Sequence, residues 1–266
     1  MVWDPILLPN KPWRQPRIPT LGTACRHFRE GRRMSREVAC KTFGVATSWL
    51  FQIEMQNKMP SIEVLDQIIK GYNLDSAQAR HLQQLRVPSE TLESSHDLRH
   101  RVTTNAAQMA HLRDLEDLGV LGAYVDPMAS ILACNNLFRT AMPGVEDEDM
   151  GSYPVWLFSP QAKEVVVEWP READHGVAAT KGALGRYRDA RQSQDLLRHL
   201  RNNKEYRNRW AANITISYGR DTNDLLRLRD PVTKVVTPYA FSHSPQSRSV
   251  LLYVGFPKND ATHRLS

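Results

Sequence analysis

The sequence has few of the features that mark secreted, metal-binding and membrane-spanning proteins. Its 266 residues include only three cysteines, Cys25, Cys40 and Cys134, and their spacing shows no pairs. This excludes a disulfide framework and indicates a reducing compartment. No apolar run approaches the roughly 20 residues that span a bilayer, and the first 20 residues lack the apolar core of a signal peptide. We therefore expect a cytoplasmic protein with no membrane partner.

Patterns of catalysis and cofactor binding are missing as well. His96 and His100 lie four residues apart, but two histidines supply at most half of a zinc site. The segment GALGRY lacks the glycine pattern of a dinucleotide site. Cys134 has no activating partner nearby in the sequence. We expect neither an enzyme nor a resident metal or cofactor.

Positive charge is concentrated in the first third of the chain. Residues 1–90 contain 13 Lys and Arg against 8 Asp and Glu, whereas the remaining residues contain 22 against 21. Residues 11–36 alone hold eight basic residues and one acid, Glu30. Such asymmetry is typical of a protein that binds a polyanion with one of its parts.

The patterning divides the chain into five segments. Five prolines in residues 1–20 favour an extended arm, which either packs onto a surface or follows a phosphate backbone. Residues 21–86 predict short helices, 87–103 a polar linker with a helical end, 104–258 mixed helices and strands, and 259–266 a tail. We expect a multidomain chain, an all-α N-terminal domain followed by an α+β C-terminal domain. Strands are expected at 122–126, 164–169, 214–218, 234–241 and 248–256, among others.

Residues 35–55 predict two short helices joined by a tight turn. Ser35 is a good N-cap and Gly44 ends the first helix, so the turn falls at 43–45 and the second helix at 46–55. The second helix carries Thr47, Ser48 and Gln52 opposite its apolar stripe. A solvated helix face normally carries Lys, Glu and Arg, whereas short alcohols and amides suit the edges of bases in the major groove. An ordinary solvated face is the alternative.

Residues 21–74 resemble a phage-repressor or XRE-type helix-turn-helix domain. The resemblance rests on Ser35, Ala39, Gly44-Val45, Ile53-Glu54 and Pro60-Ser61 at matching spacing. It departs at Trp49, which is bulkier than usual, and at Met55-Gln56, which replaces a basic residue and a glycine. The resemblance implies that Arg29 pairs with Glu54 inside the domain. It also implies DNA contacts by six residues: Arg36, Thr47, Ser48, Gln52, Asn57 and Lys58.

The second part of the chain, roughly 105–256, is similar to the PAS-like ligand-binding domain of the MmyB-like regulators. The similarity rests on AYVDPMASILACNNLFRTAMPG, VWLFSPQAKEVVVEW, GRYRDARQ and EYRNRWA in that order. It implies a cavity for a fatty acid or similar apolar ligand. We expect this cavity to be lined by Leu132, Phe138, Trp156, Phe158, Trp169, Tyr187, Trp210 and Phe241. The alternative is that these side chains form a filled core.

The two resemblances together imply a sequence-specific transcriptional regulator of a bacterial, nucleoid-associated kind. It would bind double-stranded DNA at a palindromic operator as a homodimer and sense a small apolar or fatty-acyl ligand. The alternative is a helix-turn-helix protein whose second domain only joins protomers and holds no ligand.

Overall fold

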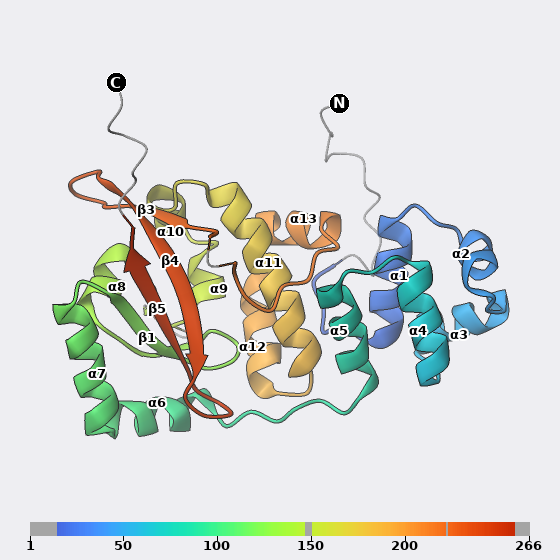
Figure 1. The fold of residues 1–266 in the computed structure, drawn as a ribbon, viewed down its shortest axis with the longest axis horizontal. Coiled ribbons are helices and arrows are strands. Elements are labelled where there is room, and N and C mark those ends of the chain that lie inside the picture. Colours follow the sequence, from blue (N-terminus) through green and yellow to red (C-terminus); the bar gives the residue numbers. More distant parts are fainter. Residues whose placement is uncertain (1–14, 147–150, 222, 259–266) are drawn as a thin grey trace. The chain divides into compact units, whose positions relative to one another are not determined.

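The computed structural model describes residues 15–146, 151–221 and 223–258 (Figure 1). Most of the expected arm and the whole expected tail therefore lie outside the described residues. The chain forms two compact units, and the boundary between them falls within a helix. The first unit comprises the described part of Met1–Thr91 together with Val177–Tyr218, and the second comprises the described parts of Leu92–Gly176 and Gly219–Ser266. None of the described helices is long and apolar enough to cross a membrane.

Five helices from the N-terminal region form the base of the first unit. They are α1 (Leu21–Gly31), α2 (Arg36–Phe43), α3 (Thr47–Gln56), α4 (Ile62–Gly71) and α5 (Ser76–Arg86). Their inward faces meet in one core, in which Phe28, Leu50, Ile53 and Ile68 are almost completely buried. Ser35 caps α2 as predicted, and Gly44 ends it with φ at +70°, a backbone conformation that glycine adopts without strain.

The first unit also contains part of the C-terminal region. This part is the second half of α11 (Trp169–Arg186), α12 (Arg191–Leu200), α13 (Lys204–Ala212) and the segment up to Tyr218. Ile216 is buried in the same core as α1–α5, and Ile214 packs against it. The strand expected at 214–218 is wrong: the segment has no strand partner, and Ser217 N–H donates instead to the carbonyl of Ala178 in α11.

The second unit is built on a five-stranded antiparallel sheet. Its strands are β1 (Leu121–Val125), β2 (Ile131–Cys134), β3 (Leu226–Arg229), β4 (Val236–Pro245) and β5 (Leu251–Pro257). Their order across the sheet is β2-β1-β5-β4-β3, and Figure 1 shows the long strands β4 and β5 side by side. This confirms the α+β character expected of the C-terminal region.

Helices cover the sheet, and two of them occupy a segment that was predicted to be a strand. Helix α6 (Ser95–Thr104) is the helical end expected of the linker, and its Leu98 is buried with residues of α7 (Ala106–Asp117), β1 and β2. Short helices α8 (Asn136–Ala141), α9 (Tyr153–Trp156) and α10 (Pro160–Val165) follow. The strand expected at 164–169 is wrong, because this segment ends α10 and begins α11, leaving a single bridge between Val166 and Leu228 of β3.

Asn135 fixes the connection from β2 to α8. Its Oδ1 accepts hydrogen bonds from the N–H groups of Gly122 (3.2 Å) and Phe138 (3.0 Å). Its Nδ2 donates to the carbonyl of Val120 at 2.9 Å. The side chain is buried, so every one of these bonds forms away from water. Asn135 therefore caps α8 and ties it to the edge of β1 at the same time.

Candidate nucleic-acid interface and ligand-binding region

The predicted recognition helix α3 begins without a side-chain cap. It starts at Thr47, one residue later than expected, and Ala46 at the N-cap position offers no hydrogen-bond acceptor from its side chain. No acid lies in its first turn. The other four helices of the N-terminal region are each capped by a side chain, from Thr20, Ser35, Ser61 and Asp75. The first N–H groups of α3 are therefore available to an external acceptor, and phosphate is a typical one.

The outer side of α3 presents the polar side chains picked out by the sequence. Thr47 and Ser48 are exposed, and Gln52 is half-buried. Lys58 Nζ donates to Gln52 Oε1 at 3.1 Å and lies 4.5 Å from the centre of the Trp49 ring. The structure thus brings together Thr47, Ser48, Gln52 and Lys58 on one accessible side of the helix.

The inner side of α3 is held by a buried ion pair. Arg29 of α1 donates from Nε to Glu54 Oε1 at 2.6 Å and from Nη2 to Glu54 Oε2 at 2.8 Å. Burial alone would lower the pKa of Arg29, but the Glu54 carboxylate outweighs it and the pKa is raised. The pairing of Arg29 with Glu54 is therefore confirmed. Because Leu50 and Ile53 on the same side are fully buried, this pair fixes the rotation of α3 about its axis.

Two of the predicted DNA contacts have partners inside the protein that the sequence did not predict. Arg36 Nε donates to Glu54 Oε2 at 2.9 Å, so Arg36 is a second partner of the buried carboxylate. Asn57 ends α3 in the left-handed conformation, with φ at +52°, and its Oδ1 accepts from the N–H of Gly22 in α1 at 3.0 Å. A DNA contact by either side chain stays a prediction.

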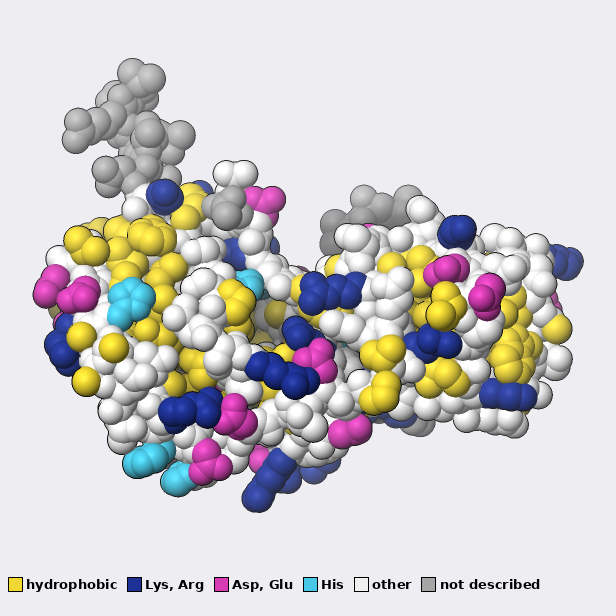
Figure 2. Space-filling model, turned by 60° about the horizontal axis from the view of Figure 1, so that its bottom comes forward, with side chains coloured by type: hydrophobic (Ala, Val, Ile, Leu, Met, Phe, Trp, Pro, Cys, Tyr) yellow, Lys and Arg dark blue, Asp and Glu magenta, His cyan; other side chains and the backbone are white. Residues whose placement is uncertain are grey.

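Sequence reasoning missed an apolar patch beside these polar groups. Phe51 and Met55 on α3 are 44% and 49% exposed, and Val38, Met59 and Ile62 are exposed as well. Figure 2 shows hydrophobic side chains at the surface of its right-hand end, where Figure 1 has α2 and α3. The sequence did contain a sign of this patch: Phe51 and Met55 are four residues apart, so they share one face of the helix, and they lie outside its buried stripe. Exposed apolar groups of this kind mark surfaces that contact a partner.

Three aromatic residues predicted to line a ligand cavity pack closely in the second unit. Phe158 and Trp169 meet edge to face with ring centres 5.9 Å apart. The indole N–H of Trp169 donates to the carbonyl of Leu157 at 2.7 Å, and that of Trp156 donates to the carbonyl of Pro143 at 2.8 Å. Each indole therefore has its polar group satisfied by the backbone, as in a protein core.

The other predicted ligand residues are divided between the two units. In the second unit Phe138 is the buried residue of α8, Leu132 is buried in the cluster that includes α6 and α7, and Phe241 is half-buried on β4. Tyr187 and Trp210 are buried in the first unit. The structure thus brings six of the eight residues into the second unit, while the single cavity predicted from all eight stays untested.

A buried charged cluster in the second unit was not predicted. Glu172 of α11 is 1% exposed and is paired with Arg220, which also contacts Asp224 at 3.1 Å. Burial alone would lower the pKa of Arg220, but Glu172 outweighs it and the pKa is raised. Burial, followed by the charge of Arg220, lowers the pKa of the neighbouring His175. Glu172 and Arg220 lie 48 residues apart in the sequence, so no local pattern could have paired them.

A protein-family model identifies the family to which the second part of the chain belongs. The family model of the MmyB-like transcription regulator ligand binding domain matches residues 107–266. The chain belongs to this family. No curated protein matches the sequence. The match covers the sheet and α7–α13, so this MmyB-like protein is a transcription regulator that carries a ligand-binding domain. It also shows that Val177–Tyr218, which folds with the N-terminal helices, is part of the ligand-binding family domain.

Proposed function

We propose that this MmyB-like regulator reads specific DNA sequences by placing α3 in the major groove. The observation that carries the proposal is the asymmetry of α3: the pair of Glu54 with Arg29 holds its inner side, while its uncapped N-terminus, Thr47 and Ser48 face outward. A major groove admits one α-helix, and the N-terminal residues of that helix contact base edges. The free N–H groups of the first turn would then meet a phosphate.

Each exposed group of α3 has a role suited to its chemistry. Gln52 would contact an adenine edge with its amide, once its hydrogen bond with Lys58 is exchanged for one with the base. Lys58, released from Gln52, would contact a phosphate. The exposed ring of Phe51 suits a thymine methyl group or a deoxyribose, which have no charge to desolvate.

Recovery of bound DNA from fragmented genomic DNA, followed by footprinting, tests this proposal. We expect a small set of fragments that share a half-site. If the protein acts as a homodimer, two half-sites will lie about 34 Å apart, or one turn of DNA. Uniform recovery of fragments, without a shared sequence, would show that the N-terminal region does not recognise a specific DNA sequence.

We further propose that the ligand-binding domain has a PAS-like fold and takes a small apolar or fatty-acyl molecule. The antiparallel sheet with helices packed on it supports this, together with the aromatic side chains around Trp169. A ligand can regulate DNA binding only when it binds the competent and incompetent states unequally. Val177–Tyr218 offers a route for this coupling, because it belongs to the family domain and shares a core with α1–α5.

One observation favours the alternative, a second domain that only joins protomers. Trp156, Phe158 and Trp169 are buried and satisfied by protein groups, which is how residues of a filled core behave. Solvent extraction of the purified protein followed by mass spectrometry separates the two functions. A stoichiometric apolar molecule supports sensing, whereas its absence, together with no change in operator affinity on adding fatty acids, supports the structural role.

A further inference from the structure

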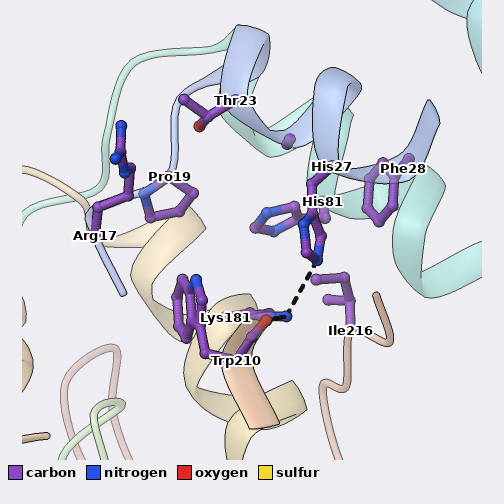
Figure 3. A pocket seen from close by; sticks show the side chains of 10 residues that line it. Arg17, Pro19, Thr23, His27, Phe28, His81, Lys181, Trp210 and Ile216 are labelled. Atoms are coloured by element: carbon purple, nitrogen blue, oxygen red, sulfur yellow. Dashed lines mark hydrogen bonds between the residues drawn. The ribbon is translucent and has the colours of Figure 1, made fainter. Parts of the chain in front are cut away.

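A small, partly open cavity lies in the first unit, between the N-terminal helices and helices α11 and α13 (Figure 3). Its volume is about 40 Å³. One water needs about 10–15 Å³, so the cavity has room for a few waters or for one group the size of a carboxylate. Ten residues line it: Arg17, Pro19, Thr23, Ala24, His27, Phe28, His81, Lys181, Trp210 and Ile216.

Most of the wall of this cavity is apolar, and its ionisable side chains are all basic. Arg17, His27, His81 and Lys181 line it, and none of the described residues that line it is acidic. They come from the segment before α1, from α1, from α5 and from α11, so the fold gathers them from three distant parts of the sequence. Figure 3 shows Lys181 and the two histidine rings converging on the same space. A cavity with low-dielectric walls and basic side chains concentrates positive potential.

Among the described residues, no carboxylate pairs with the buried ammonium of Lys181. It is 4% exposed, and its Nζ donates to the carbonyl of Trp210 at 3.0 Å and to that of Asn213, at the end of α13. It also lies 5.0 Å from the centre of the Trp210 ring. The end of a helix carries only about half a negative charge, so these contacts offset part of the lysine charge. Burial lowers the pKa of Lys181 to about 7.

His81 of α5 lines the same cavity. Its ring is 2% exposed, and in the described structure its Nδ1 has no hydrogen-bond partner. Burial first, and then the charges of Lys181 and His27, lower the pKa of His81 to about 3. The ring is therefore neutral near pH 7. An unpartnered buried nitrogen is uncommon in native proteins, and this one lies against Gly185 of α11.

We propose that this cavity binds a carboxylate group, with Lys181 as its charge partner and Arg17 and His27 beside it. An anion there would complete the charge balance that the end of α13 supplies only in part. The carboxylate can belong to a small acid or to the end of a longer acid. The site lies in the first unit and does not depend on an apolar ligand in the second. Its lining joins α1 and α5 to α11 and α13, so an occupied site ties the N-terminal helices to the family domain.

Saturation-transfer NMR on the full chain tests the site, with the methyl signal of acetate as the readout. The titration is done at pH 6 in MES buffer without chloride, where Lys181 carries its charge. We expect saturable binding. Lys181→Met should weaken acetate binding at least about tenfold, because that change in affinity corresponds to the loss of one charge-assisted hydrogen bond. Lys70→Met removes the same charge from an exposed position of α4 and should leave binding unchanged.

Two further measurements separate the sources of the carboxylate and guard against misfolding. Octanoate that competes with acetate and binds more tightly identifies the end of a longer acid, whereas acetate binding without competition identifies a small acid. Arg17→Gln changes no core residue and should also weaken acetate binding. If Lys181→Met does not fold, this variant tests the carboxylate site in its place. Acetate binding should fall as the pH rises through about 7, because Lys181 then loses its proton. The other ionisable groups that line the cavity are Arg17, His27 and His81. The absence of saturable binding of either acid, or equal binding by the wild type and a folded Lys181→Met protein, overturns the proposal.

Discussion

Glu54 on the predicted recognition helix receives two hydrogen bonds from the guanidinium of Arg29, at 2.6 and 2.8 Å, in the core of the N-terminal helices. The two residues lie on α3 and α1, so this pair sets how the two helices cross. Its buried oxygens have no access to water, and Arg36 supplies the third hydrogen bond. The presentation of α3 therefore depends on a pair that is buried in the core, away from the exposed side of the helix.

Removing one partner of this pair should strongly destabilise the protein. We expect Arg29→Met to lower the free energy of unfolding by about 3–5 kcal/mol, because it leaves the Glu54 carboxylate buried with Arg36 alone. Chemical denaturation followed by circular dichroism measures this. Asp66→Asn, which removes a charge from an exposed position of α4, should change the same free energy by less than about 0.5 kcal/mol. Equal effects would show that the pair is not structural.

A new cap on α3 should separate stability from DNA binding. Ala46→Asp places an acceptor where none exists, so we expect the free energy of unfolding to rise by about 0.5–2 kcal/mol. The same carboxylate would occupy the N–H groups offered to a phosphate and repel it, so DNA affinity should fall. Ala46→Asn adds the cap without the charge and should bind DNA better than Ala46→Asp. If Ala46→Asp binds DNA as the wild type does, the N-terminus of α3 does not face a phosphate.

Gln52 and Lys58, which are hydrogen-bonded to each other, should have different effects on specificity. Gln52→Ala should cost about 1–3 kcal/mol at the recovered operator and little on random DNA. Lys58→Ala should weaken binding to all sequences and reduce the slope of log affinity against log salt by about 1. Fluorescence anisotropy at several salt concentrations measures both. Parallel losses for Gln52→Ala on both DNAs would assign Gln52 to general affinity.

Asn135 should be far more important for stability than its neighbour. Asn135→Ala leaves the N–H groups of Gly122 and Phe138 and the carbonyl of Val120 without their partner, at a cost of about 1–3 kcal/mol for each buried group. Asn136 is exposed, and its amide contacts Glu116 at the surface. Asn136→Ala should therefore cost less than about 1 kcal/mol. Urea unfolding of the two variants measures the difference, and similar midpoints would contradict the assigned role of Asn135.

The pKa of His81 predicts a loss of stability in acid. Its pKa is about 3 in the folded protein, and an unfolded histidine has a pKa near 6.5. Below pH 6.5 the unfolded chain takes up a proton that the folded chain excludes, so stability falls between pH 6.5 and 3, by at most about 5 kcal/mol. His81→Gln should remove this part of the pH dependence. Urea unfolding in buffers without carboxylates measures it, and identical pH profiles for both proteins would show that His81 does not contribute.

The sequence predicted the features of the N-terminal helices that depend on local chemistry. Ser35 as a cap and Gly44 as a helix end follow from what each residue can do with its own backbone. The contact of Asn57 with Gly22 and the bond from Arg36 to Glu54 could not be predicted in this way, because both join residues that meet only after α1, α2 and α3 pack together.

Two strand predictions failed because an apolar pattern of strand length does not say what buries the residues. ITISY at 214–218 alternates as a strand does, yet Ile216 is buried against helices of the first unit. The segment at 164–169 contains three consecutive valines, but it lies between a helix that begins at Pro160 and one whose second residue is Pro170. Proline is tolerated at the start of a helix, so the two prolines were the better signal. The strand β3 (LRLR) was missed because it is short and half of its residues are arginines.

Selection of DNA from a randomised duplex library by the full chain tests the central claim most directly. The selection is run in parallel with the wild type and with a variant carrying Thr47→Ala, Ser48→Ala and Gln52→Ala. If α3 reads bases, the wild type will enrich one half-site, and the variant will lose that enrichment while keeping weak, salt-sensitive binding to all sequences. Enrichment of the same half-site by both proteins, or by neither, would contradict the assignment of α3 as the recognition helix.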